Sequence, residues 1–161
     1  MNHSKNQVLR WIAFLMCISI FTTGSWAQAS FSKEKLYHLY TSAKTKNVVY
    51  EKPGNLLGTT DFEKSNAAQY WTVTELSGSW RIINPVTNKA IRAEGNFVEL
   101  GENNGSDELQ LWQYENGLLV PTNRPDVAMK ANSDGELVLI KKTQALKDKM
   151  AQFTFKESAY A

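Results

Sequence analysis

The sequence predicts an all-β domain built from three copies of one unit of about forty residues. The first observation is a motif that occurs as Gln69-Tyr70-Trp71 and again, 41 positions later, as Gln110-Leu111-Trp112. A weaker copy, Gln152-Phe153-Thr154-Phe155, starts 42 positions after Gln110. The second observation is that short apolar runs alternate with turn residues between the motifs, as in all-β proteins.

Residues 1–29 have the features of a cleaved signal peptide. A short basic stretch precedes an apolar run at 11–21, and Ala27 and Ala29 form a small-residue cleavage signal. The run is shorter than the roughly 20 residues that span a bilayer. Bulky residues precede Cys17, so we expect its removal with the signal rather than lipidation.

Residues 30–161 are expected to form one exported domain, secreted or periplasmic, that starts at Ser30. The chain has 18 basic and 16 acidic residues, and the signal removes Lys5 and Arg10 but no acid, which leaves 16 of each sign. A neutral domain lacks the field that attracts nucleic acid or anionic lipid. We therefore expect no nucleic-acid partner and no membrane insertion after cleavage.

The first repeat is expected at 36–75. Its predicted strands are Leu36–Tyr40, Val48–Tyr50, Leu56-Leu57 and Trp71–Thr74. The turn at Lys52–Asn55 contains Pro, Gly and Asn, which suit a tight turn, and we expect the third strand to end near Gly58. The loop at 61–68 is expected to contain one helical turn.

The second and third repeats follow the same order of elements. The predicted strands of the second are Trp80–Ile83, Ala90–Ala93, Phe97–Leu100 and Gln110–Tyr114. Those of the third are Gly117–Val120, Val127–Lys130, Leu137–Ile140 and Phe153–Phe155. Turns are expected at 84–88, 94–96, 121–125 and 133–135, and the loop at 141–150 has helical character.

Three units are too few for a propeller, which typically has four to eight blades. A barrel capped by three hairpins, the β-trefoil, accommodates them. The motif resembles the repeated Q-x-W motif of ricin-type β-trefoil lectins, and the resemblance covers 36–157. We expect an all-β trefoil in which Trp71 and Trp112 fill the core, while Gln69, Gln110 and Gln152 satisfy backbone groups at the start of each fourth strand.

The resemblance implies a carbohydrate-binding module. Ricin-type sites place an Asp in the second strand of a repeat, and this position falls at Tyr50, Arg92 and Lys130. The family's aromatic residue and the Asn before the Q-x-W motif are also missing in each repeat. We therefore expect degenerate sugar sites, and the alternative is a structural or protein-interaction trefoil without sugar binding.

Repeat two is the expected place of a ligand, because its loop is rich in short polar side chains. The candidate ligand-binding residues are Arg92, Asn103, Asn104, Asp107, Gln110, Tyr50 and Lys130. The planar fork of Arg92 suits a carboxylate or sulfate, which favours an acidic glycan. Tyr50 and Lys130 offer a stacking ring and a point charge at the matching positions.

The sequence predicts no enzyme, no metal and no cofactor. His38 is the one histidine after residue 29, and a general base needs a partner. The loop at 103–108 lacks the ordered ligand spacing of a calcium site. No motif for nucleophilic catalysis, zinc binding or phosphate binding occurs in the sequence.

Overall fold

The computed structural model describes residues 30–42 and 47–159. The predicted signal peptide at 1–29 lies outside the described residues. Within the described residues, no helix is long and apolar enough to cross a membrane.

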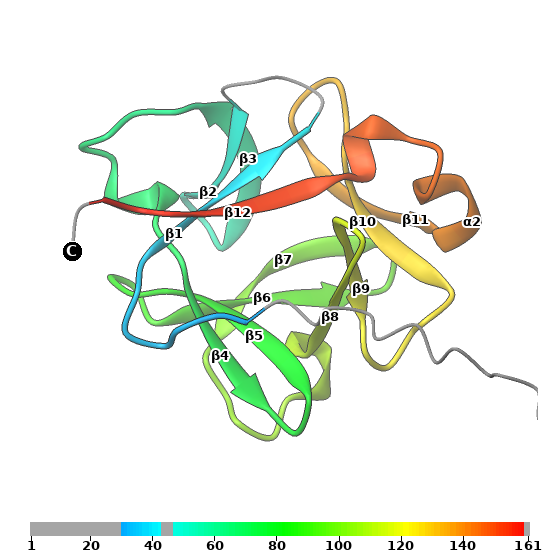
Figure 1. The fold of residues 1–161 in the computed structure, drawn as a ribbon, viewed down its shortest axis with the longest axis horizontal. Coiled ribbons are helices and arrows are strands. Elements are labelled where there is room, and N and C mark those ends of the chain that lie inside the picture. The colour runs from blue at the N-terminus through cyan, green and yellow to red at the C-terminus, as the bar shows by residue number, and fades with distance from the viewer. Residues whose placement is uncertain (1–29, 43–46, 160–161) are drawn as a thin grey trace, which may run out of the picture.

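The described chain is an all-β structure of twelve strands with short helical turns (Figure 1). The strands are β1 (Tyr37–Thr41), β2 (Asn47–Lys52), β3 (Leu56–Asp61), β4 (Thr72–Leu76), β5 (Ser79–Asn84), β6 (Lys89–Glu94), β7 (Phe97–Glu102), β8 (Trp112–Glu115), β9 (Leu118–Pro121), β10 (Val127–Ala131), β11 (Leu137–Lys141) and β12 (Phe153–Glu157). The helical turns are η1 (Ala67–Gln69), η2 (Glu108–Gln110), α2 (Lys142–Ala145) and η3 (Lys149–Ala151).

The first and fourth strands of the three repeats form a barrel. The fourth strand of each repeat pairs antiparallel with the first strand of the next, as β4 with β5 and β8 with β9. The last strand, β12, returns to pair with β1, so that it lies alongside β1 in Figure 1. Within a repeat, β1 meets Trp71, the residue directly before β4, at Tyr37, and β5 meets β8 at Trp80 and Trp112.

The second and third strands of each repeat form a hairpin, and the three hairpins are joined in a ring. Leu100 N–H donates to the Asn55 carbonyl at 2.9 Å, and Leu139 N–H donates to the Asn96 carbonyl at 3.1 Å. Thr59 N–H donates to the Gly135 carbonyl at 2.8 Å and completes the ring. In each case the turn of one hairpin binds the third strand of the next, as expected of a pseudo-threefold β-trefoil.

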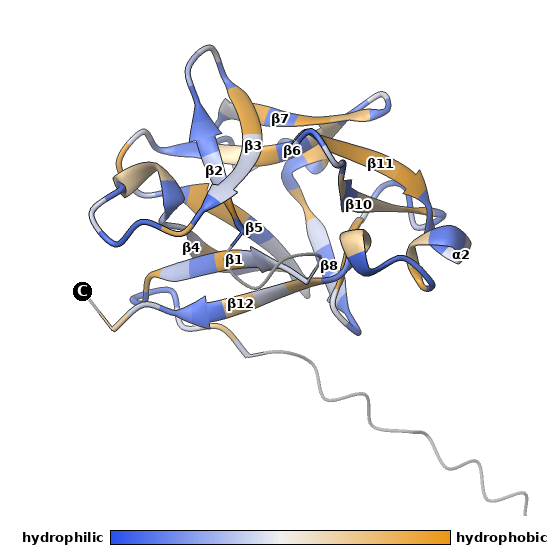
Figure 2. Cartoon of the chain, turned by 90° about the horizontal axis from the view of Figure 1, so that it is seen from above, coloured by the Kyte–Doolittle hydropathy of each residue, from blue (hydrophilic) through white to orange (hydrophobic). Residues whose placement is uncertain are grey.

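The core is built from matching residues of the three repeats. Each triplet contributes one buried apolar side chain per repeat: Leu39, Ile82 and Leu119; Val49, Ile91 and Met129; Trp71, Trp112 and Phe153. Figure 2 shows hydrophobic stretches in strands such as β7 and β11, with hydrophilic residues in the turns. The prediction that Trp71 and Trp112 fill the core is confirmed, because both are fully buried.

The third copy of the motif differs by one residue from its predicted register. The turns η1 and η2 end at Gln69 and Gln110, and the matching turn η3 ends at Ala151. The prediction that Gln152 matches the other two glutamines is therefore wrong. The period is 41 residues at both steps, and Phe153 rather than Thr154 takes the tryptophan position.

Some element boundaries also differ from those expected. Strand β3 continues past Gly58 to Asp61, because its outer half pairs with the start of β2. Gln110 belongs to a helical turn rather than to a strand, and Pro121 ends β9 rather than starting a turn. The helical character expected at 141–150 is confirmed in α2 and η3.

Candidate functional site

The buried glutamines Gln69 and Gln110 hold the loop between the third and fourth strands. Gln69 Nε2 donates to the Asp61 carbonyl at 2.9 Å, and Gln69 Oε1 accepts from the Glu63 N–H at 2.9 Å. Gln110 makes the same pair of contacts one repeat later, at 2.7 Å and 3.1 Å. Both side chains are committed to backbone groups, which leaves them little capacity for a ligand.

Two of the side chains predicted to bind a ligand in repeat two, Asn104 and Asp107, are hydrogen-bonded within their own loop. Asn104 Oδ1 accepts from both the N–H and the hydroxyl of Ser106, at 3.1 Å and 2.9 Å. Asp107 Oδ1 caps η2 by accepting from the Leu109 N–H at 3.0 Å, and its Oδ2 accepts from Gln110 Nε2 at 3.1 Å. These side chains shape the loop, as short polar residues at helix caps usually do.

Asn103 is held by Arg81, a residue that sequence reasoning missed. Arg81 Nη1 donates to Asn103 Oδ1 at 3.3 Å, and Arg81 Nη2 donates to the Gly105 carbonyl at 3.1 Å. Arg81 is only 9% exposed, and no ion pair engages it within the described residues. Arg81 follows Trp80 directly, as His38 follows Tyr37, so the two side chains lie at matching positions of their repeats.

Arg92 and Gln110, two of the residues predicted to bind a ligand, both lie close to Gly101. A Cβ at Gly101 would stand 2.7 Å from Arg92 Cδ and 3.6 Å from Gln110 Nε2, so the arginine packs directly over the glycine. Arg92 Nη2 is 2.6 Å from Glu94 Oε2, and Nη1 is 3.8 Å from Glu99 Oε1. The guanidinium already has carboxylate partners, with which an acidic ligand would have to compete.

Tyr50 and Lys130 occupy the matching positions on separate hairpins, so the candidate residues do not form one site. Lys130 Nζ is 2.8 Å from Asp148 Oδ2. The hydrogen bond from Lys130, together with one from the Met150 N–H, holds the pKa of Asp148 below its ordinary value. The Tyr50 ring lies over Gly58, where a Cβ would be 3.1 Å from its Cε1.

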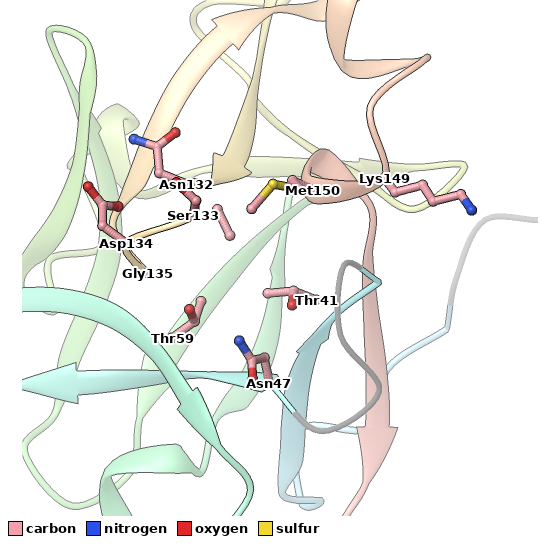
Figure 3. Close-up of a pocket in the computed structure, with 10 residues that line it drawn as sticks. Thr41, Asn47, Thr59, Asn132, Ser133, Asp134, Gly135, Lys149 and Met150 are labelled. Atoms are coloured by element: carbon pink, nitrogen blue, oxygen red, sulfur yellow. The ribbon is translucent and has the colours of Figure 1, made fainter.

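A cavity of about 540 Å³ lies between repeats one and three (Figure 3). Its lining residues come from β1, β2, β3, the end of β10 and the turn that follows it, and η3. They are Thr41, Asn47, Thr59, Ala131, Asn132, Ser133, Asp134, Gly135, Lys149 and Met150. Sequence reasoning missed this cavity because its lining residues come from two repeats and form no local motif.

The described residues contain no group of three or more His, Cys, Asp or Glu side chains that could hold a metal ion. The loop at 103–108 instead uses its oxygens in the hydrogen bonds given above.

No protein-family model matches the chain, and no curated protein matches it. The structure is similar to the C-half of an earthworm R-type lectin solved with GalNAc, with a TM-score of 0.60 and 15% identity, covering 77% of this chain and 99% of that one. The designed threefold symmetric protein ThreeFoil has a TM-score of 0.58 and 14% identity, with 74% of this chain and 96% of that one covered.

Parts of larger proteins are similar as well. A GlcNAcα1-4Gal releasing endo-β-galactosidase from Clostridium perfringens has a TM-score of 0.66 and 16% identity, covering 77% of this chain. The chain spans 32% of the length of that protein and 18% of the length of a mosquitocidal holotoxin. Identities this low establish the shared fold alone, which is the β-trefoil fold of ricin-type lectin domains.

Proposed function

We propose that this chain is an exported carbohydrate-binding module with altered sugar sites, and not an enzyme. The observation that carries the proposal is the similarity to a lectin domain over 99% of that domain's length. That earthworm lectin domain was solved in complex with GalNAc, and a mutant C-terminal domain of an earthworm lectin was solved in complex with 6'-sialyllactose. The sequence 1–29 supports export, because it has the three regions of a signal peptide.

The altered sites predict a specificity different from that of a galactose-type lectin. An Asp accepts hydrogen bonds from sugar hydroxyls, whereas Arg92 and Lys130 only donate and are paired with carboxylates. Tyr50 is the remaining member of the set, and its ring and hydroxyl suit stacking and a single hydrogen bond. These substitutions favour weak binding, or none, at the three matching positions.

The test is a glycan array probed with the processed chain, followed by titration of each hit in solution. We expect saturable binding that the free sugar competes away. Binding that no free sugar competes, or silence across neutral and acidic glycans at millimolar concentration, would overturn the proposal. Mass spectrometry of the exported protein tests processing, with Ser30 or a neighbour expected at the N-terminus.

The second candidate is a structural or protein-interaction trefoil without sugar binding. The observation that favours it is that the predicted polar groups are already hydrogen-bonded within the protein. Asn104 and Asp107 bond within their own loop, and Asn103 bonds to Arg81 and Asn88. Silence on the array, together with a partner protein that binds the purified chain at a defined stoichiometry, would select this function.

A further inference from the structure

The cavity between repeats one and three lies at a junction where the threefold pattern changes. The ring of hairpin contacts places Thr59, Leu100 and Leu139 at matching positions. Leu100 and Leu139 are buried members of the core, whereas Thr59 is partly exposed and lines the cavity. A threonine in place of a leucine is smaller and brings a hydroxyl to a position that is otherwise apolar.

Gly135 lies at one edge of this cavity. Its φ of +88° lies in the left-handed region, and its carbonyl accepts the Thr59 N–H at 2.8 Å. A Cβ at Gly135 would lie 3.1 Å from Thr59 Oγ1 and 3.2 Å from the Thr59 carbonyl oxygen. The two hairpins therefore approach closely at this point, and the cavity has a wall made of backbone.

One wall of the cavity carries free polar groups. Figure 3 shows Thr41, Asn47 and Thr59 on the same side of the cavity, on strands of repeat one. Thr41 is only 3% exposed. Within the described residues, the side chains of these three residues take part in none of the hydrogen bonds or ion pairs. Their polar atoms are not among the buried unpaired ones of the described residues, so they face solvent and can bind a polar ligand.

The opposite wall combines the apolar side chains of Met150 and Ala131 with the polar residues Asn132 and Ser133. Met150 faces the threonines from η3, and Ala131, at the end of β10, also lines the cavity. Figure 3 shows the side chains of Lys149 and Asp134 directed away from the cavity. The Asp134 carboxylate accepts the Glu136 N–H at 3.1 Å and so belongs to the turn.

We infer that this cavity binds one ring of an uncharged sugar, with its hydroxyls on Thr41, Asn47 and Thr59 and its C–H face on Met150. The inference rests on the proposed function and assigns the ligand to a junction between repeats rather than to Tyr50, Arg92 or Lys130. The volume of about 540 Å³ falls in the range of small-molecule pockets, roughly 300–1,000 Å³. Apolar contacts combined with a few polar groups are the usual arrangement of such pockets.

The NMR signals of the methionine methyl groups provide a direct measurement of sugar binding in the cavity. Met150 lines the cavity and Met129 is fully buried in the core, and no other methionine follows residue 29. The processed chain, labelled at methionine methyls, is titrated with the methyl glycosides of galactose, glucose, mannose and N-acetylgalactosamine. At least one sugar is expected to shift the Met150 signal saturably while the Met129 signal stays in place.

Thr59→Leu is the matched variant, because leucine occupies this position in the other two repeats. We expect this variant to fold, with a melting temperature no lower than that of the wild type, and to bind the sugar at least ten-fold more weakly. Arg92→Gln is the control and is expected to bind as the wild type does. An unchanged affinity in Thr59→Leu, or a loss in Arg92→Gln, would overturn the inference and leave the lectin function standing. Failure of every glycan to bind the wild type would overturn both.

Discussion

The indole Nε1–H of Trp112 donates to the backbone carbonyl of Ile91 at 2.9 Å. Trp71 makes the matching bond to the Val49 carbonyl at 3.1 Å, so each of the first two repeats ties its fourth strand to its second. Phe153, at the same position in repeat three, has no side-chain N–H to donate. The first two repeats are therefore held by a buried hydrogen bond that the third lacks.

Two replacements of Trp112 should separate the contribution of its packing to stability from that of its hydrogen bond. Trp112→Ala is expected to lower the free energy of unfolding by about 3–5 kcal/mol, as large core truncations do. Trp112→Phe keeps much of the packing but leaves the Ile91 carbonyl buried without a donor, at a cost of about 1–3 kcal/mol. Urea denaturation measures both changes.

The matched control for this prediction is Phe97→Ala, because Phe97 is 68% exposed. Surface substitutions usually change stability by less than about 0.5 kcal/mol. Equal effects of the changes at Phe97 and Trp112 would contradict the burial of the tryptophan.

Alanine substitutions of Gln110 and Gln152 test whether Gln152 has the structural role that Gln110 has in repeat two. Gln110→Ala removes the partners of the Glu102 carbonyl and the Asn104 N–H, and we expect a loss of about 2 kcal/mol. Gln152 is partly buried and donates once, to the Ala145 carbonyl at 3.3 Å, so Gln152→Ala should cost less than about 1 kcal/mol.

Amide hydrogen exchange gives a second readout for the same pair of variants. The Asn104 N–H is expected to exchange faster in Gln110→Ala and at the wild-type rate in Gln152→Ala. Equal destabilisation by the two variants would mean that Gln152, and not Ala151, belongs to the repeat.

The ion pairs of Arg92 predict how charge affects glycan binding. Because Glu94 and Glu99 neutralise the guanidinium, sulfated or uronic oligosaccharides should bind no more tightly than neutral ones of the same size. Replacing both partners, as Glu94→Gln with Glu99→Gln, would free the guanidinium and raise the affinity for sulfated ligands. Calorimetry at low and physiological salt measures this. Tighter binding of acidic glycans by the wild type would instead support the acidic-glycan site expected from sequence.

The fold could be predicted from sequence because the local signals agree with one another. Apart from Ser77, glycines and asparagines occupy the positive-φ positions of the described turns, as at Asn55, Gly95 and Gly117, and apolar runs separate them. The alignment predicted for the third motif copy differs by one residue from the structure, because Phe153 replaces the tryptophan that marks the register in the first two repeats. With no tryptophan to align on, Gln152 matched better in sequence than Ala151 does.

The site was less predictable, because it depends on contacts between segments far apart in the chain. The pairing of Arg92 with Glu99 follows from the hairpin register and could have been counted from the turn. The cavity could not be predicted from the sequence. Thr59 is recognised as the counterpart of a leucine only after the three hairpins are aligned in space. Arg81 gave no signal either, since a charged residue on a predicted strand is usually expected at the surface.

The buried His38 of β1 allows us to predict how stability depends on pH. His38 is 4% exposed, its Nδ1 lies 3.1 Å from the Gln69 carbonyl, and the rings of Phe62 and Tyr70 pack against it. Burial lowers the pKa of His38 below its ordinary value, and the bond to the Gln69 carbonyl offsets part of this effect. The neutral imidazole, with Nδ1–H donating to the carbonyl, is therefore the form that the fold favours.

Because the pKa is lower in the folded state, the unfolded chain takes up a proton first as pH falls. The contribution of His38 to stability is fully present above the unfolded pKa of about 6.5 and is lost as pH falls toward the folded pKa. We expect the urea midpoint of the wild type to drop between pH 7.5 and 5.5. In His38→Phe, which fills similar space and does not titrate, the midpoint should change less over the same interval. Asp148 does not interfere, because its pKa is lowered from 3.8 and it titrates below this range. The same pH dependence in both proteins would show that another group is responsible.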